Sequence, residues 1–252
     1  FQMQLEHMNE LESIIYVEGQ AKILLLPIQE SADESLLQIE SGDGNKIMQT
    51  LDVHMAVDSI DYFVPLDLDN YRQGSGETIM IRMKGLYNNA VTWDAIEMVD
   101  TFDTTNRETF RPIYHHTPLY GWMNDANGLV YKDGEYHLYF QYNPYGSVWG
   151  NMHWGHSVSK DLMHWEHKAP VIARDSLGHI FSGSSVVDVE NTAGYGAGAI
   201  IAFYTSASEK NGQIQCMAYS KDNGYTYTKY EKNPILTPFD GIKDFRDPKV
   251  FW

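Results

Sequence analysis

A polar cluster followed by a short apolar run occurs three times in the second half of the chain. The copies are "NDANGLVY", "FSGSSVVD" and "FRDPKVFW", and their key residues Asp125, Ser182 and Asp247 stand roughly 60 residues apart. A period of this length, with several strands in each unit, is typical of β-propeller blades, which bury their faces by stacking on their neighbours. The pattern predicts that the polar clusters start the innermost strands and point into one central funnel.

A second echo supports the repeat. "HSVSKDLMHWEHKAPVI", from His156, returns as "MAYSKDNGYTYTKYEKNPIL", from Met217, with Ser-Lys-Asp, an aromatic centre and a terminal proline in both copies. A plain succession of hairpins is the alternative interpretation, because Lys-Asp-x-Gly turns are common in proteins of many classes.

The first part of the chain has a different pattern. From Ser13 to Val99, apolar and polar residues alternate in about seven short runs separated by Gly, Asp, Asn and Ser clusters, which predicts an antiparallel sandwich. The polar segment "DTFDTTNRETFRP" that follows is typical of a linker. We therefore expect an all-β protein with an N-terminal β-sandwich accessory module at 1–106 and a propeller part at 107–252, with the boundary near Asn106.

Composition excludes several classes of function. The net charge of −16 opposes binding to a phosphate backbone, so we expect no nucleic-acid partner. No stretch approaches the roughly 18 apolar residues of a membrane span. The 17 Tyr and 6 Trp suit carbohydrate, because their flat faces stack on sugar rings. The single Cys216 cannot form an internal disulfide.

Five motifs, in order, resemble the successive signatures of glycoside hydrolase family 32, which comprises invertases, inulinases and levanases. They are "WMNDANG", "FQYNPYGSVWGNMHWGH", "SKDLMHW", "FSGSSV" and "FRDP", and the match runs from about Tyr114 to Trp252. The family usually has Pro where Ala126 stands, a change that removes a backbone constraint but no reactive group. The resemblance implies a five-bladed propeller, of which this chain would hold blades 1 and 2 and the start of blade 3, so we expect a truncated fragment.

The resemblance also implies roles for individual residues. Asp125 matches the catalytic nucleophile, and Asp247 matches the carboxylate that stabilises the transition state. Retaining cleavage of a glycosidic bond needs a nucleophilic carboxylate and an acid/base carboxyl group about 5 to 5.5 Å apart. The positions that match the lining of the fructosyl pocket are Asn124, Gln141, Trp149, Phe181, Ser182 and Arg246.

The acid/base residue of the family is a Glu followed by Cys, downstream of Arg-Asp-Pro, and no Glu follows Asp247 in this sequence. Glu166 and Glu231 lie within the second echo, where we expect outer strands that face solvent. The acid/base Glu is therefore expected downstream, and the fragment alone is expected to be inactive. The "HWGH" motif would turn its two histidines to opposite faces of a strand, so we expect no metal site, and no cofactor is implied.

The predicted function is that of a retaining glycosidase that cleaves β-fructosidic bonds in levan or inulin, with sucrose as a further candidate substrate. The alternatives are a fructosyltransferase with the same site, a five-bladed glycosidase acting on pentose polymers, and a non-catalytic fructan-binding protein. A polymeric substrate favours an extracytoplasmic location: secreted, periplasmic or at the cell surface.

Overall fold

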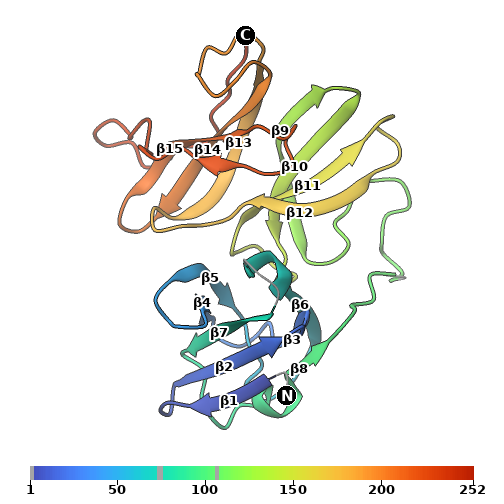
Figure 1. The fold of residues 1–252 in the computed structure, drawn as a ribbon, viewed down its shortest axis with the longest axis vertical. Helices are drawn as coiled ribbons and strands as arrows, with labels where there is room; N and C mark the ends of the chain where they lie inside the picture. Colours follow the sequence, from blue (N-terminus) through green and yellow to red (C-terminus); the bar gives the residue numbers. More distant parts are fainter. Residues whose placement is uncertain (1–2, 73–75, 106–107) are drawn as a thin grey trace. The chain divides into compact units, whose positions relative to one another are not determined.

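Two compact units make up the chain. The computed structural model describes residues 3–72, 76–105 and 108–252 (Figure 1). The first unit comprises 1–111, 119–122 and 143–151, and the second comprises 112–118, 123–142 and 152–252. The predicted boundary near Asn106 lies outside the described residues. The all-β prediction is confirmed, because the described elements are strands apart from η1 (Leu68–Tyr71) and α1 (Thr92–Ala95).

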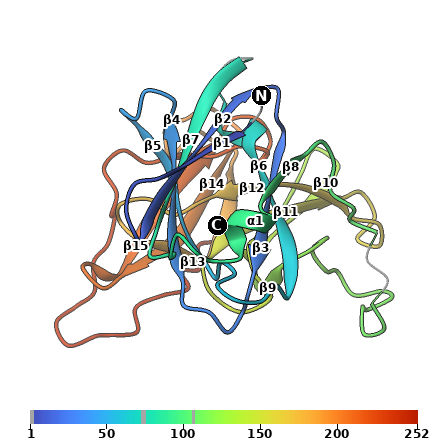
Figure 2. The same ribbon diagram turned by 90° about the horizontal axis from the view of Figure 1, so that it is seen from below.

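The first unit contains two antiparallel sheets. The larger has the order β1-β2-β7-β4-β5, and the smaller has the order β6-β3-β8. In Figure 2, β3, β6 and β8 lie beside one another and apart from β4 and β5. The strands of the unit are β1 (Met3–His7), β2 (Glu12–Gly19), β3 (Ile23–Ile28), β4 (Ser35–Ser41), β5 (Ile47–Val53), β6 (Tyr62–Asp67), β7 (Gly76–Lys84) and β8 (Glu97–Val99).

Both sheets contribute to one hydrophobic core. Successive side chains of a strand point to opposite faces, so every second residue can be buried. Leu24 and Leu26 of β3 are fully buried, and so are Leu37 and Ile39 of β4 on the other sheet. The two sheets of this unit therefore share one core, and the sandwich arrangement stays a prediction.

The second unit contains two four-stranded meanders, with the orders β12-β11-β10-β9 and β13-β14-β15-β16. One core joins them, because Tyr139 and Trp154 of the first meander cluster with Ala202 and Tyr204 of the second. The strands are β9 (Trp122–Lys132), β10 (Glu135–Asn143), β11 (His153–Ser159), β12 (Glu166–Ile172), β13 (His179–Asp188), β14 (Ala199–Ser208), β15 (Gly212–Ser220) and β16 (Thr228–Lys229).

The two copies of the Ser-Lys-Asp echo fold into the same kind of turn. Each follows the third strand of its meander, and in each the serine hydroxyl donates to the aspartate two residues on, while the next residue has a positive φ. The copies are Ser159, Asp161 and Leu162 (3.1 Å, φ 66°) and Ser220, Asp222 and Asn223 (2.7 Å, φ 61°). The repeat read from the sequence therefore corresponds to two blade-like sheets built in the same order.

The polar clusters do not start the strands, which corrects the prediction. β9 begins at Trp122, before Asp125, and β13 begins at His179, before Ser182. An extended backbone continues through polar residues when its ladder hydrogen bonds are kept, so the first apolar residue is a poor marker of a strand start. No strand is assigned in the described segment 241–252, although "KVFW" is apolar.

Candidate active site

Asp125 lies on β9, and its side chain reaches the neighbouring sheet. The Ser182 hydroxyl of β13 donates a hydrogen bond of 2.8 Å to Oδ2 of Asp125. Asp125 itself is exposed, whereas Ser182 is buried. Two residues predicted for one site are thus in direct contact, although they belong to different copies of the repeat.

Gly128 lets β9 approach its neighbours closely. Its φ is +53°, and a Cβ at this position would lie 2.7 Å from Oγ of Ser185, 2.7 Å from the Trp154 ring and 2.9 Å from the Tyr139 ring. Only glycine combines this φ with this lack of space. The Asn-Gly of the motif is therefore a packing requirement, and it fixes the strand that carries Asp125.

Gln141 and Asn127 form a buried amide pair that joins β10 to β9, the strand of Asp125. Nε2 of Gln141, on β10, donates to Oδ1 of Asn127, on β9, at 2.9 Å, and both side chains are almost fully buried. The bond orients the Gln141 amide. Asn124 is half-buried on the same strand, and the backbone carbonyl of Phe181 accepts a 3.0 Å hydrogen bond from Nε1 of Trp154.

Three side chains of the second meander hold the segment that contains Arg-Asp-Pro. Oγ of Ser184 donates to the Pro248 carbonyl at 2.8 Å. The backbone N–H of Asp247 donates to Oγ1 of Thr205 at 3.2 Å, and Nε2 of Gln215 donates to the Phe245 carbonyl at 2.6 Å.

These three anchors come from β13, β14 and β15, and the sequence prediction did not include them. A signal existed for Ser184, because it stands two residues after Ser182 and alternate residues of a strand share a face. Asp247 is exposed and has a φ of 64°, a conformation that non-glycine residues seldom adopt.

Arg246 forms hydrogen bonds with nearby side chains of the second unit. Its guanidinium donates to the Asp244 carboxylate and, at 3.4 Å, to Oε1 of Gln213. The side chain is exposed. Its predicted contact with substrate stays a prediction, as does the convergence of Asp247 and Arg246 with Asp125.

Trp149 lies in the loop 143–151, which is grouped with the first unit. Its side chain is 56% exposed. The loop joins β10 to β11, so it is covalently continuous with the meander that carries Asp125.

The other candidate groups stand apart from Asp125. Glu166 is exposed on the edge strand β12 and pairs with Lys168, as predicted, whereas Glu231 is exposed in a turn after β16 and not on a strand. His156 is buried, and its Nε2 lies 3.0 Å from Nδ1 of His137. Within the described ranges, no group of three or more His, Cys, Asp or Glu side chains could hold a metal ion. No helix in that part of the chain is long and apolar enough to cross a membrane.

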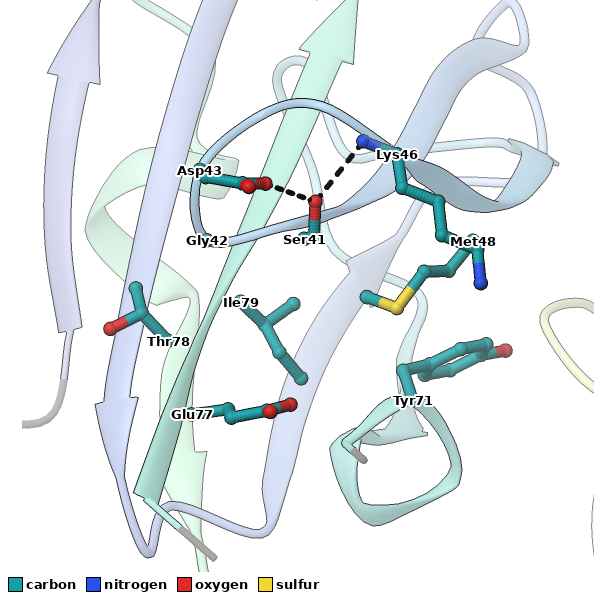
Figure 3. A pocket seen from close by; sticks show the side chains of 9 residues that line it. All are labelled: Ser41, Gly42, Asp43, Lys46, Met48, Tyr71, Glu77, Thr78 and Ile79. Atoms are coloured by element: carbon teal, nitrogen blue, oxygen red, sulfur yellow. Dashed lines mark hydrogen bonds between the residues drawn. The ribbon is translucent and has the colours of Figure 1, made fainter. Parts of the chain in front are cut away.

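A pocket of about 310 Å³ lies in the first unit, and none of the residues that line it is a predicted site residue (Figure 3). The Asp43 carboxylate at its rim already accepts hydrogen bonds from the Ser41 hydroxyl at 2.6 Å and from Asn45. The lining residues are Ser41, Gly42, Asp43, Lys46, Met48, Tyr71, Glu77, Thr78 and Ile79.

The two blade-like meanders define a propeller-type protein. Its candidate catalytic group is the Asp125 carboxylate of the first meander, which accepts a hydrogen bond from the Ser182 hydroxyl of the second. The model of the glycosyl hydrolases family 32 N-terminal domain matches residues 115–252. The chain therefore belongs to glycosyl hydrolase family 32. A domain of unknown function, DUF4980, matches residues 9–114.

Several characterised relatives resemble the chain. It is 56% identical over 148 residues to the levanase of Bacillus subtilis (strain 168), a match that covers 58% of this chain and 22% of the levanase. It is 42% identical over 171 residues to the extracellular exo-inulinase of Aspergillus awamori, covering 58% of this chain and 32% of that protein. Invertase 2 of Saccharomyces cerevisiae is 47% identical over 159 residues, with coverages of 59% and 29%. The chain thus spans about a fifth to a third of the length of these relatives.

Two solved structures are also similar to this chain. The exo-inulinase of Aspergillus awamori superposes with a TM-score of 0.54 and 40% identity, over 60% of this chain and 34% of that one. The β-fructofuranosidase of Schwanniomyces occidentalis, solved with fructosyl-erythritol, gives 0.52 and 45%, over 56% and 29%. The propeller-type fold is confirmed, and the count of five blades stays a prediction.

Proposed function

We propose that the protein is a retaining glycoside hydrolase that cleaves β-fructosidic bonds in levan or inulin, with sucrose as a further substrate. Membership of the family supports this function, and the matched relatives are named levanase, exo-inulinase and invertase. The single observation that carries the proposal is the contact between Asp125 and Ser182. It orients one carboxylate at the meeting point of two repeats.

Asp125 is the proposed nucleophile. The Ser182 hydroxyl occupies Oδ2, so Oδ1 is the oxygen that attacks the anomeric carbon of the fructosyl unit. The hydrogen bond holds the carboxylate in one orientation, and a well-positioned carboxylate is what this nucleophilic attack needs. As the carbon–oxygen bond to Asp125 forms, the bond to the leaving group breaks, and the leaving oxygen takes a proton from the acid/base residue.

The remaining roles complete the proposed mechanism. A Glu downstream of this chain is the acid/base residue, and it then activates the water that releases fructose from Asp125. Asp247 stabilises the positive charge that develops on the sugar ring. The fructosyl unit is bound by Asn124, Gln141, Trp149, Phe181, Ser182 and Arg246.

The proposed location is extracytoplasmic. The matched exo-inulinase of Aspergillus awamori is named an extracellular protein. A polymeric substrate such as fructan also favours an enzyme that acts outside the cytoplasm. The proposed partner is the fructan chain itself.

The test is Asp125→Asn in the intact enzyme. This change keeps the size and most hydrogen bonds of the side chain but removes the nucleophile, so kcat should fall by on the order of 10³ or more, about 4 kcal/mol of barrier. Binding of fructan should change little. Initial rates and binding isotherms with inulin, levan and sucrose measure both quantities.

Asp133→Asn is the matched control. Asp133 is an exposed carboxylate in the turn that ends β9, where it pairs with Lys132, and its loss should leave kcat within about twofold. An Asp125→Asn enzyme that turns over fructan at close to the parent rate would rule out the assignment.

A further inference from the structure

Tyr62 of the first unit hydrogen-bonds to the loop 143–151, which carries Trp149. The backbone N–H of Ser147 donates to the Tyr62 hydroxyl at 2.9 Å, and that hydroxyl donates to Oε1 of Glu30 at 2.7 Å. The Ser147 hydroxyl donates to the same carboxylate oxygen. Burial raises the pKa of Tyr62 to about 12, so the phenol keeps its proton at neutral pH.

Further contacts fix the rest of the loop. Tyr145 packs against the core of the first unit. The backbone N–H of Asp52 donates to Oδ1 of Asn151 at 3.4 Å. Within the loop, the Asn143 side chain accepts from the Tyr145 N–H and donates to the Val148 carbonyl, both at 3.0 Å. The loop is therefore anchored at its start, its middle and its end.

Only the tip of the loop is left in solvent. Gly146 and Asn151 are buried, whereas Val148 is 36% and Trp149 56% exposed. A large exposed aromatic on a fixed base loses little further conformational freedom when a ligand binds, which is how preorganised sites gain affinity. Tyr62 lies on β6, which pairs with β3, and Glu30 follows β3 by two residues.

We propose that Tyr62 and Glu30 are positioning residues for Trp149, so that the first unit acts on substrate binding through the loop 143–151. This inference rests on the proposed function, in which Trp149 binds the fructosyl unit. It gives the first unit a part in substrate specificity, in place of a role as an independent sugar-binding module or as a passive brace.

The test uses Tyr62→Phe, which keeps the ring and removes the hydroxyl. Tyr16→Phe is the matched control, because the Tyr16 hydroxyl also donates to a carboxylate of the first unit, that of Glu6, at 3.3 Å. In the chain described here, hydrogen exchange of a peptide covering 144–150 should be at least about tenfold faster in Tyr62→Phe, and unchanged in the control.

In the intact enzyme, Tyr62→Phe should raise KM for inulin or sucrose about 3- to 10-fold and change kcat less than about twofold. A general loss of stability would not produce this split. In a Trp149→Ala background, Tyr62→Phe should have no further effect on KM, because the side chain that it positions is gone.

Three results would overturn the inference. Unchanged exchange in Tyr62→Phe would show that the hydroxyl does not hold the loop. Faster exchange with an unchanged KM, while Trp149→Ala still raises KM, would defeat the positioning role and leave the proposed function intact. If Trp149→Ala leaves KM unchanged, both the pocket assignment of Trp149 and the positioning role fail.

Discussion

At the scale of single residues, the Ser182 hydroxyl is the hydrogen-bond partner that orients the Asp125 carboxylate. A hydrogen bond to a charged group is worth roughly 1.5 to 3 kcal/mol when it is shielded from water, and the exposure of Asp125 lowers that figure. Ser182→Ala should therefore reduce kcat/KM by about tenfold, far less than the loss of the carboxylate itself. Steady-state kinetics with sucrose measure the change.

Ser206→Ala is the control for this substitution. Ser206 lies on β14, and its buried hydroxyl has no hydrogen-bond partner in the described structure, so kcat/KM should stay within about twofold of the parent. A Ser182→Ala enzyme with the same kcat/KM as the control would show that this hydroxyl does not support the nucleophile.

The residues around the site differ in how far the sequence could predict them. The repeat spacing placed the clusters of Asp125 and Ser182 in one funnel, and the family resemblance assigned both residues to one site; their direct hydrogen bond was not predicted. The grip of Thr205 and Gln215 on the Arg-Asp-Pro segment could not be read in the same way. Those bonds join side chains to backbone groups about 30 to 40 residues away, and such pairs have no sequence signature.

At the scale of elements, β9 depends on Gly128. In Gly128→Ala, the new Cβ would meet the Trp154 and Tyr139 rings at under 3 Å in a φ that alanine avoids. We expect a loss of about 3 kcal/mol or more in the free energy of unfolding of the second unit. Urea denaturation followed by near-UV circular dichroism measures it.

Gly134→Ala separates the steric clash of the new Cβ from the backbone strain of a positive φ. Gly134 also has a positive φ, +86°, but nothing lies within 4 Å of a Cβ built there, so only the backbone strain of about 1 kcal/mol should appear. Equal losses in the two variants would contradict the packing explanation.

Element boundaries were predicted less well than element types. The two Ser-Lys-Asp turns were visible in the sequence because Ser and Asp hydrogen-bond to nearby backbone groups, which is a local property. The starts of β9 and β13 were wrong by a few residues, because the polar residues of the site lie inside those strands. The lack of a strand at 245–252 was also missed, since this segment is held by side chains and not by a ladder.

At the scale of the whole molecule, buried histidines make stability depend on pH. Burial lowers the pKa of His156 to about 3, with His137 and Lys168 adding to the shift, and burial lowers the pKa of His116 to about 4, with His167 adding to it. Each of these two imidazoles binds a proton near pH 6.5 in the unfolded chain but only at a lower pH in the folded chain. Their contribution to the free energy of unfolding is therefore complete above pH 6.5 and is lost as the pH falls toward 4.

We expect the second unit to be less stable at pH 5 than at pH 7.5, by up to about 1.4 kcal/mol per pH unit for each of these histidines. The exposed His164 acts in the opposite sense, because Asp161 raises its pKa. His156→Gln should therefore show a smaller loss between the two pH values than the parent. Equal pH dependence of the urea midpoint in parent and variant would contradict this explanation.

The central claim for the whole molecule is that Asp125 forms a covalent bond to the fructosyl unit. The most direct measurement is mass spectrometry of peptides from intact enzyme that has been quenched during turnover of a slow, activated fructoside. We expect a peptide that contains Asp125 and carries one added fructosyl residue, and no such peptide from Asp125→Asn. An adduct on a different carboxylate, or cleavage that inverts the anomeric configuration with no adduct, would contradict it.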